Sequence, residues 1–204
     1  MKNEAFSLTE HGWETAMPKG VLSSYLREKR KKIVKNFVKG DVLDLGCGKA
    51  DFYELYRDKI TSYYGVDIDT EIVKALQAKF PECKFFRYDF DEDTLHFDMK
   101  FDCILMVGLI EHLYNQKHIM KQVKNCLKPE GIIVITTPTP LGNDIVHRYG
   151  SKINLFSPRA ADDHVVIYNK KRFEILAKDI GLKIEKYKSF QLGCNQLVVL
   201  KNQE

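Results

Sequence analysis

The feature that most constrains this chain is a regular alternation, from about residue 40 onward, of short apolar strands with helix-length segments. Apolar runs predict strands at 41–45, 62–67, 84–88, 101–107 and 132–136. Helical spacing of apolar residues predicts helices at 50–58, 70–80, 115–127 and 169–180. Strands joined through helices form right-handed crossovers, so the pattern predicts an α/β protein with a parallel sheet covered on both faces.

The two ends of the chain depart from this alternation. Residues 19–39 carry eight Lys/Arg against one Glu, with apolar residues at helical spacing, which predicts an amphipathic helix with a charged outer face. Residues 182–190 and 196–201 are typical of an antiparallel hairpin. We therefore expect an N-terminal helical cap at 1–39 and a main domain at 40–204.

Residues 138–168 are rich in Pro and Gly and lack sustained periodicity. A segment of this length inside a compact domain is typical of a lid or a substrate-binding insertion. We expect it to gate access to a site at the adjacent sheet edge.

Composition limits the class of protein. The net charge of +4 is too small to indicate a nucleic-acid binder by itself. Five scattered cysteines without a C-x-x-C pair indicate reduced thiols, and neither a secretory leader nor an 18-residue apolar run is visible. These features predict a cytoplasmic protein without a membrane segment.

Polar groups and glycines gather at the ends of successive predicted strands. Gly46 and Gly48 follow the first strand, Asp67 ends the second, and Asp89 with Phe90 follows the third. Ligands of open α/β sheets bind at this edge. A carboxylate in the place of Asp67 suits the hydroxyls of a ribose, and Asp89 with Phe90 suits an adenine ring.

The identity of residue 51 narrows the choice of nucleoside ligand. A dinucleotide-binding turn requires a third glycine there, whereas this chain has Asp51. A carboxylate would repel a pyrophosphate at a helix N-terminus. The site is better suited to a ligand without phosphates and with a cationic centre, which describes S-adenosylmethionine.

Five segments in order resemble the motifs of class I S-adenosylmethionine-dependent methyltransferases: VLDLGCGKADF (42–52), YYGVDID (63–69), FRYDF (86–90), FDCILMVGLIEHLYN (101–115) and LKPEGIIVITTP (127–138). The resemblance covers about residues 38–201, and its branch is that of small-molecule and glycan-type methyltransferases. It implies a doubly wound, Rossmann-like, mostly parallel seven-stranded sheet whose last strand is antiparallel.

The resemblance also assigns residues to the cofactor. It implies that Asp44, Gly46, Cys47 and Gly48 line the methionine moiety and that Asp67 and Ile68 hold and cover the ribose. Asp89 and Phe90 would hold the adenine, and Met106 would lie beside the cofactor at the end of the fourth strand.

Two histidines are candidates for catalysis. An acceptor that must lose a proton requires a base. His112, just after the fourth strand, and His164, shortly before the last predicted helix, resemble positions where small-molecule methyltransferases place a histidine. Metal-dependent small-RNA methyltransferases are also similar here, but Gly108 stands where they have a glutamate, so no metal is expected.

The sequence thus predicts methyl transfer from S-adenosylmethionine to an oxygen atom of a small-molecule or glycan-type acceptor. A nucleic-acid partner is not expected, and neither is a membrane partner. Two alternatives stay open: an RNA- or protein-directed methyltransferase, and a non-catalytic cofactor-binding partner subunit. The acceptor and the oligomeric state are not specified by the sequence.

Overall fold

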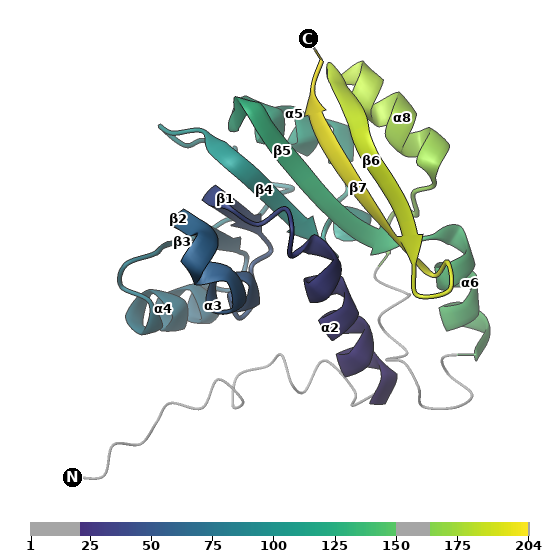
Figure 1. Ribbon diagram of the computed structural model, residues 1–204, viewed down its shortest axis with the longest axis horizontal. Helices are drawn as coiled ribbons and strands as arrows, with labels where there is room; N and C mark the ends of the chain where they lie inside the picture. Colours follow the sequence, from purple (N-terminus) through teal and green to yellow (C-terminus); the bar gives the residue numbers. More distant parts are fainter. Residues whose placement is uncertain (1–20, 150–163, 204) are drawn as a thin grey trace.

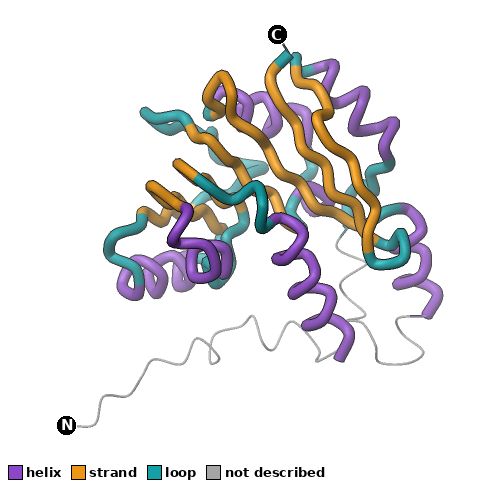
Figure 2. The backbone as a smooth tube through the Cα atoms, viewed as in Figure 1, coloured by secondary structure: helices purple, strands orange, loops and turns teal. Residues whose placement is uncertain are grey.

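The computed structural model describes residues 21–149 and 164–203, which form a seven-stranded sheet in the order β3-β2-β1-β4-β5-β7-β6 (Figure 1, Figure 2). The strands are β1 (Gly40–Leu45), β2 (Ile60–Asp67), β3 (Lys84–Arg87), β4 (Phe101–Val107), β5 (Leu127–Pro138), β6 (Leu182–Phe190) and β7 (Asn195–Asn202). Strands β1 to β5 pair in parallel, and β7 lies antiparallel between β5 and β6. The predicted doubly wound, mostly parallel fold with an antiparallel last strand is confirmed.

Helices cover both faces of this sheet. They are α2 (Val21–Val34), α3 (Asp51–Tyr56), α4 (Thr70–Lys79), α5 (Gln116–Asn125), α6 (Pro140–Tyr149) and α8 (Lys170–Asp179), with the 3-10 turns η1 (Arg57–Lys59) and η2 (Ile110–His112). Side chains of α2, α3 and α4 share one buried cluster, and those of α5 and α8 share the other. Figure 1 shows α5 and α8 on the far side of the sheet from α2 and α3.

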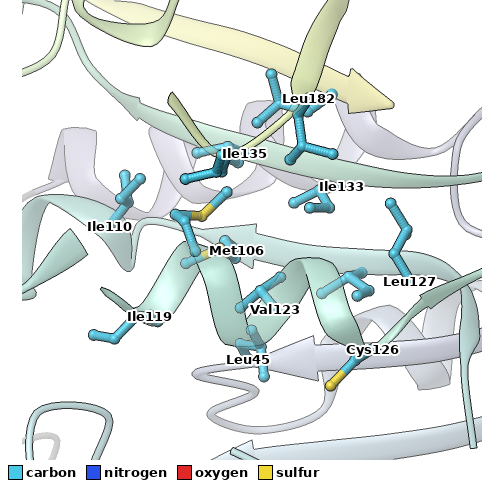
Figure 3. Packing of buried hydrophobic residues seen from close by; sticks show 14 of the residues in the cluster. Leu45, Met106, Ile110, Ile119, Val123, Cys126, Leu127, Ile133, Ile135 and Leu182 are labelled. Atoms are coloured by element: carbon cyan, nitrogen blue, oxygen red, sulfur yellow. The ribbon is translucent and has the colours of Figure 1, made fainter. Parts of the chain in front are cut away.

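The alternation of β1 explains why there are two clusters. Successive side chains of a strand point to opposite faces, so Val42 joins the α2–α4 side while Leu43 and Leu45 join the α5–α8 side. Strand β4 is buried along both faces, as its nearly continuous apolar sequence requires. Figure 3 shows the packing on the α5 side, where the side chain of Met106 points into the core.

The structure differs from the predicted elements in two places. Strand β5 begins at Leu127, before the predicted strand at 132–136, because Leu127 pairs with Phe101 at the start of β4. Residues 140–149 form helix α6 instead of the turns predicted for a lid. Pro140 is its first residue, a position where proline is well tolerated because its missing N–H is not needed.

Parts of the predicted cap and insertion fall outside the description, namely residues 1–20 and 150–163. Of the predicted cap, the described part is helix α2, whose end is anchored by the buried Val34. Among the described helices, none is both long enough and apolar enough to cross a membrane.

Candidate functional site

The turn after β1 has an unusual backbone. Gly46 and Gly48 have φ of +72° and +52°, a conformation that glycine adopts without strain, and Ala50 follows with φ of +56°. The amides of Gly46 and Cys47 both donate to the carbonyl oxygen of Val66, at 2.8 and 3.0 Å. The glycine turn is therefore fixed against the end of β2.

Asp67 joins this turn to the next strand end. Its Oδ2 accepts a hydrogen bond from the Gly48 N–H at 2.9 Å, and its Oδ1 accepts one from the Asp69 N–H at 3.1 Å. The carboxylate is buried, at 4% exposure, whereas the neighbouring Ile68 is 53% exposed. The structure thus brings the predicted Gly48 and Asp67 together and leaves an apolar side chain open beside them.

Asp44 lies beneath the turn in a position that the sequence did not explain. The Tyr63 hydroxyl donates to Asp44 Oδ2 at 2.6 Å, and Asp44 is 1% exposed. Burial raises the pKa of Asp44 to about 7, the Tyr63 hydrogen bond opposes this, and the charges of Asp67 and Asp51 add to it. The sequence analysis did not predict the hydrogen bond from Tyr63, because nothing in an apolar strand indicates which tyrosine faces a buried carboxylate.

The region around the turn carries negative charge. Asp44, Asp51 and Asp67 are near enough for their charges to interact, and among the described residues Asp51 pairs with Lys31 at 2.7 Å. Cys47 within the turn is buried, and burial together with the nearby carboxylates raises the pKa of its thiol. A neutral thiol among carboxylates suits a cationic ligand and disfavours a phosphate.

The turn after β3 contains the predicted adenine residues. Asp89 Oδ1 accepts from the Asp91 N–H at 3.1 Å, and Asp91 Oδ1 in turn accepts from the Tyr114 N–H at 3.0 Å. This turn is therefore attached to the segment after β4. Phe90 is nearly buried and Met106 is fully buried, and both belong to the core cluster beneath this edge.

The two predicted histidines meet beyond the end of β4. The rings of His112 and His164 have their centres 5.1 Å apart, and His164 Nδ1 lies 3.0 Å from Asn143 Oδ1 on α6. The Val165 N–H donates to the carbonyl oxygen of Glu111 at 2.8 Å, which holds the His164 segment against η2. Potential ligand atoms of Glu111, His112 and His164 all lie within 4.8 Å of one another.

Glu111 is the least exposed member of this group, at 1%, and its Oε2 has no hydrogen-bond partner among the described residues. Burial raises its pKa, an effect that the charges of Arg30 and His112 oppose. Arg30 Nη1 lies 3.2 Å and Glu111 Oε1 lies 3.8 Å from the position that a Cβ on Gly108 would occupy. Arg30 therefore reaches the site from α2.

Sequence reasoning missed Arg30 and did not place Asn143 beside His164. Arg30 is one of many basic residues on α2, and Asn143 was only one of several polar residues of the predicted lid. No local signal distinguishes them, because their contacts are with residues far along the chain. A separate pocket of about 270 Å³ between α8 and the segment before it contains none of the predicted site residues.

Comparisons with known proteins identify the family of the chain. The profile of a family described as a methyltransferase domain matches residues 20–187. A probable S-adenosylmethionine-dependent methyltransferase of Mycolicibacterium smegmatis is 29% identical over 98 residues, or 48% of this chain. That match spans only 38% of the relative's length.

Solved structures share the fold at low sequence identity. An S-adenosylmethionine-dependent methyltransferase of Clostridium acetobutylicum superposes with a TM-score of 0.65 at 16% identity, over 96% of this chain and 94% of that one. The magnesium protoporphyrin IX methyltransferase of Synechocystis, solved with bound SAH, superposes with a TM-score of 0.64 at 15% identity. The match covers 90% of this chain and 84% of that one.

Proposed function

Since the chain belongs to the class I S-adenosylmethionine-dependent methyltransferases and has S-adenosylmethionine as its cofactor, we propose that it methylates an oxygen atom of a small-molecule or glycan-type acceptor. One contact carries the proposal. A Cβ added at Gly46 would lie 3.4 Å from Leu109 Cδ1, so the glycine turn lies beside the segment that continues into Glu111 and His112. A cofactor on the turn would have its methyl group near the paired histidines.

The proposed cofactor site uses the edge formed by β1, β2 and β3. In this proposal Asp44, Gly46, Cys47 and Gly48 surround the methionine moiety, and the carboxylates of Asp44 and Asp67 favour its positive charges. Asp67 holds the ribose, the exposed Ile68 covers it, and Asp89 with Phe90 bounds the adenine. Met106 supports this edge from the core below.

Methyl transfer from a sulfonium requires alignment of the acceptor with the methyl group and exclusion of water. The acceptor oxygen forms the new O–CH₃ bond, the S–CH₃ bond breaks, and its electron pair returns to sulfur. A hydroxyl acceptor must also lose its proton, and in this proposal His112 or His164, whose ring centres are 5.1 Å apart, takes it. Asn143 Oδ1 can only accept, so His164 donates from Nδ1 and carries its lone pair on Nε2.

The surroundings of the histidines favour a small acceptor. Arg30 from α2, Asn143 from α6 and the segment at Val165 all lie close to Glu111 or the histidines. In this proposal, side chains from these separate elements would limit the space beside the methyl group. A folded RNA or protein would need a more open approach.

The test is transfer of a labelled methyl group to three classes of acceptor: hydroxylated small molecules and soluble oligosaccharides, RNA, and protein. We expect label on the first class, and a fall in kcat of about 10²-fold or more for His112→Ala and His164→Ala. The affinity for S-adenosylhomocysteine should stay unchanged in both variants. His118→Ala, an exposed histidine of α5, is the matched control.

Two results would overturn the proposal. Label confined to RNA or protein would show a macromolecular acceptor. Tight binding of S-adenosylhomocysteine without transfer to any class would show a non-catalytic partner subunit.

A further inference from the structure

We propose that Glu111, His112 and His164 bind one divalent transition-metal ion, for which Zn²⁺ is the probe. The sequence predicted no metal site, because Gly108 stands where metal-dependent small-RNA methyltransferases have a glutamate. The structure brings their ligand atoms within 4.8 Å of one another, from η2 and from the segment before α8.

The ligand types and their spacing fit this class of ion. Imidazole nitrogens and a carboxylate oxygen bind Zn²⁺ at about 2.0–2.2 Å, which places ligand atoms of a tetrahedral site roughly 3.4 Å apart. A group within 4.8 Å needs to contract by about an ångström or somewhat more, within the reach of side-chain rotation. Two nitrogens favour Zn²⁺ and its neighbours over Mg²⁺ or Ca²⁺, which prefer oxygen.

Asn143 orients one of the proposed ligands. Histidines that bind metals usually donate the other ring N–H to an oxygen, which fixes the tautomer and the ring orientation. The 3.0 Å contact between His164 Nδ1 and Asn143 Oδ1 is an arrangement of this kind. It leaves the lone pair on Nε2, the atom that a metal would use.

Glu111 supplies an independent observation that points to a ligand. Glu111 is only 1% exposed, yet its Oε2 has no hydrogen-bond partner among the described residues. Buried polar atoms are almost always paired, so an exception requires an explanation such as an ion. Oε1 lies toward Arg30, which provides charge for one side of the carboxylate, and the ion would serve the other.

The chemistry follows from the number of ligands. Three protein ligands leave a coordination position open for a water or for the acceptor hydroxyl, as in catalytic zinc sites. A bound hydroxyl loses its proton near neutral pH, so the proton leaves to solvent and the oxygen stays as a nucleophile. The histidines would then hold the ion instead of acting as bases. This role rests on the proposed function, whereas metal binding itself does not.

Calorimetry with the full chain, stripped by a chelator and titrated with Zn²⁺ alone, tests the proposal. We expect one ion per chain with a Kd in the micromolar range or tighter, and no comparable binding of Mg²⁺. His112→Ala and His164→Ala should abolish this event. Asn143→Ala should weaken it by about 10- to 100-fold. His118→Ala, on the exposed face of α5, should leave it unchanged.

Further readouts separate this site from adventitious binding and from loss of fold. Co²⁺ in place of Zn²⁺ should give an absorption spectrum without a thiolate charge-transfer band, since no cysteine takes part. Each variant should retain its affinity for S-adenosylhomocysteine, which reports an intact cofactor site independently. Zn²⁺ binding that survives both histidine substitutions, or a thiolate band, would overturn the proposal even if methyl transfer were established.

Discussion

Asp67 shows how one carboxylate connects the fold to the proposed ligand site. It accepts hydrogen bonds from the amides of Gly48 and Asp69, so it joins the turn after β1 to the turn after β2. Asp67 is the last residue of β2, at the edge where ligands bind in α/β sheets. A residue of this kind contributes to the shape of the site as well as to contact with the cofactor.

Replacement of Asp67 by alanine should therefore weaken binding of S-adenosylhomocysteine by about 1–3 kcal/mol, the usual loss when polar groups in a site are left unpaired. Calorimetric titration measures the dissociation constant of S-adenosylhomocysteine. Asp58→Ala, on the exposed turn after α3, is the control. A dissociation constant equal to that of the unmodified chain would place the ribose elsewhere.

Asp44 should make stability depend on pH. Its pKa is about 7 in the folded chain and near 3.8 when exposed, so between these values the folded state holds a proton that the unfolded state releases. Its contribution therefore lowers the free energy of unfolding as pH rises through this window. By pH 8 the ionisation of Asp44 would have lowered the free energy of unfolding by about 4 kcal/mol.

Asp44→Asn removes this dependence while preserving shape and an oxygen that can accept from Tyr63. We expect the variant to match the unmodified chain near pH 4 and to be more stable than it at pH 8. Urea unfolding at both values measures the difference, with Asp58→Asn as control. A difference in stability that is the same at both pH values would show that folding does not raise the pKa of Asp44.

Helix α6 illustrates how an element gains its place from contacts far along the chain. Thr139, just before it, donates from its N–H to the Cys194 carbonyl at 3.0 Å and from its hydroxyl to the Gly193 carbonyl at 2.6 Å. A Cβ on Gly142 would come 2.0 Å from the Cys194 carbonyl oxygen. Only a glycine allows the helix backbone to approach the β6–β7 turn this closely.

Gly142→Ala should displace α6 and, with it, Asn143 and its contact to His164. We expect a loss of stability of about 1–3 kcal/mol from overpacking and a marked loss of methyl transfer. Affinity for S-adenosylhomocysteine should change little, because the cofactor edge lies at β1–β3. Asp144→Ala, on the exposed side of the same helix, is the control. Full activity in Gly142→Ala would show that α6 does not position the acceptor site.

At the scale of the whole molecule, the features predictable from sequence were those written in local patterns. Periodicity predicted the parallel strands and most of the helices, and Gly46, Gly48 and Asp67 marked the edge that the structure assembles. Helix α6 was not predicted, because proline and glycine are typical of turns. In the structure Pro140 begins the helix, and Gly142 allows its backbone to pack closely against Cys194.

The acceptor side was harder to predict for a physical reason. His112 and His164 were identified, but their proximity depends on the hydrogen bond from Val165 to Glu111 and on Asn143. Arg30 of α2 interacts with Glu111, but nothing in the sequence distinguishes it from the other basic residues of that helix. Contacts between distant segments leave no trace in the spacing of either segment.

The central claim is that the edge formed by β1, β2 and β3 binds a cationic, phosphate-free nucleoside cofactor. Its most direct test is titration of the purified chain with S-adenosylhomocysteine and, separately, with NAD⁺ in a calorimeter. We predict saturable binding of one S-adenosylhomocysteine per chain and no measurable binding of NAD⁺. Tighter binding of NAD⁺ than of S-adenosylhomocysteine would contradict the claim.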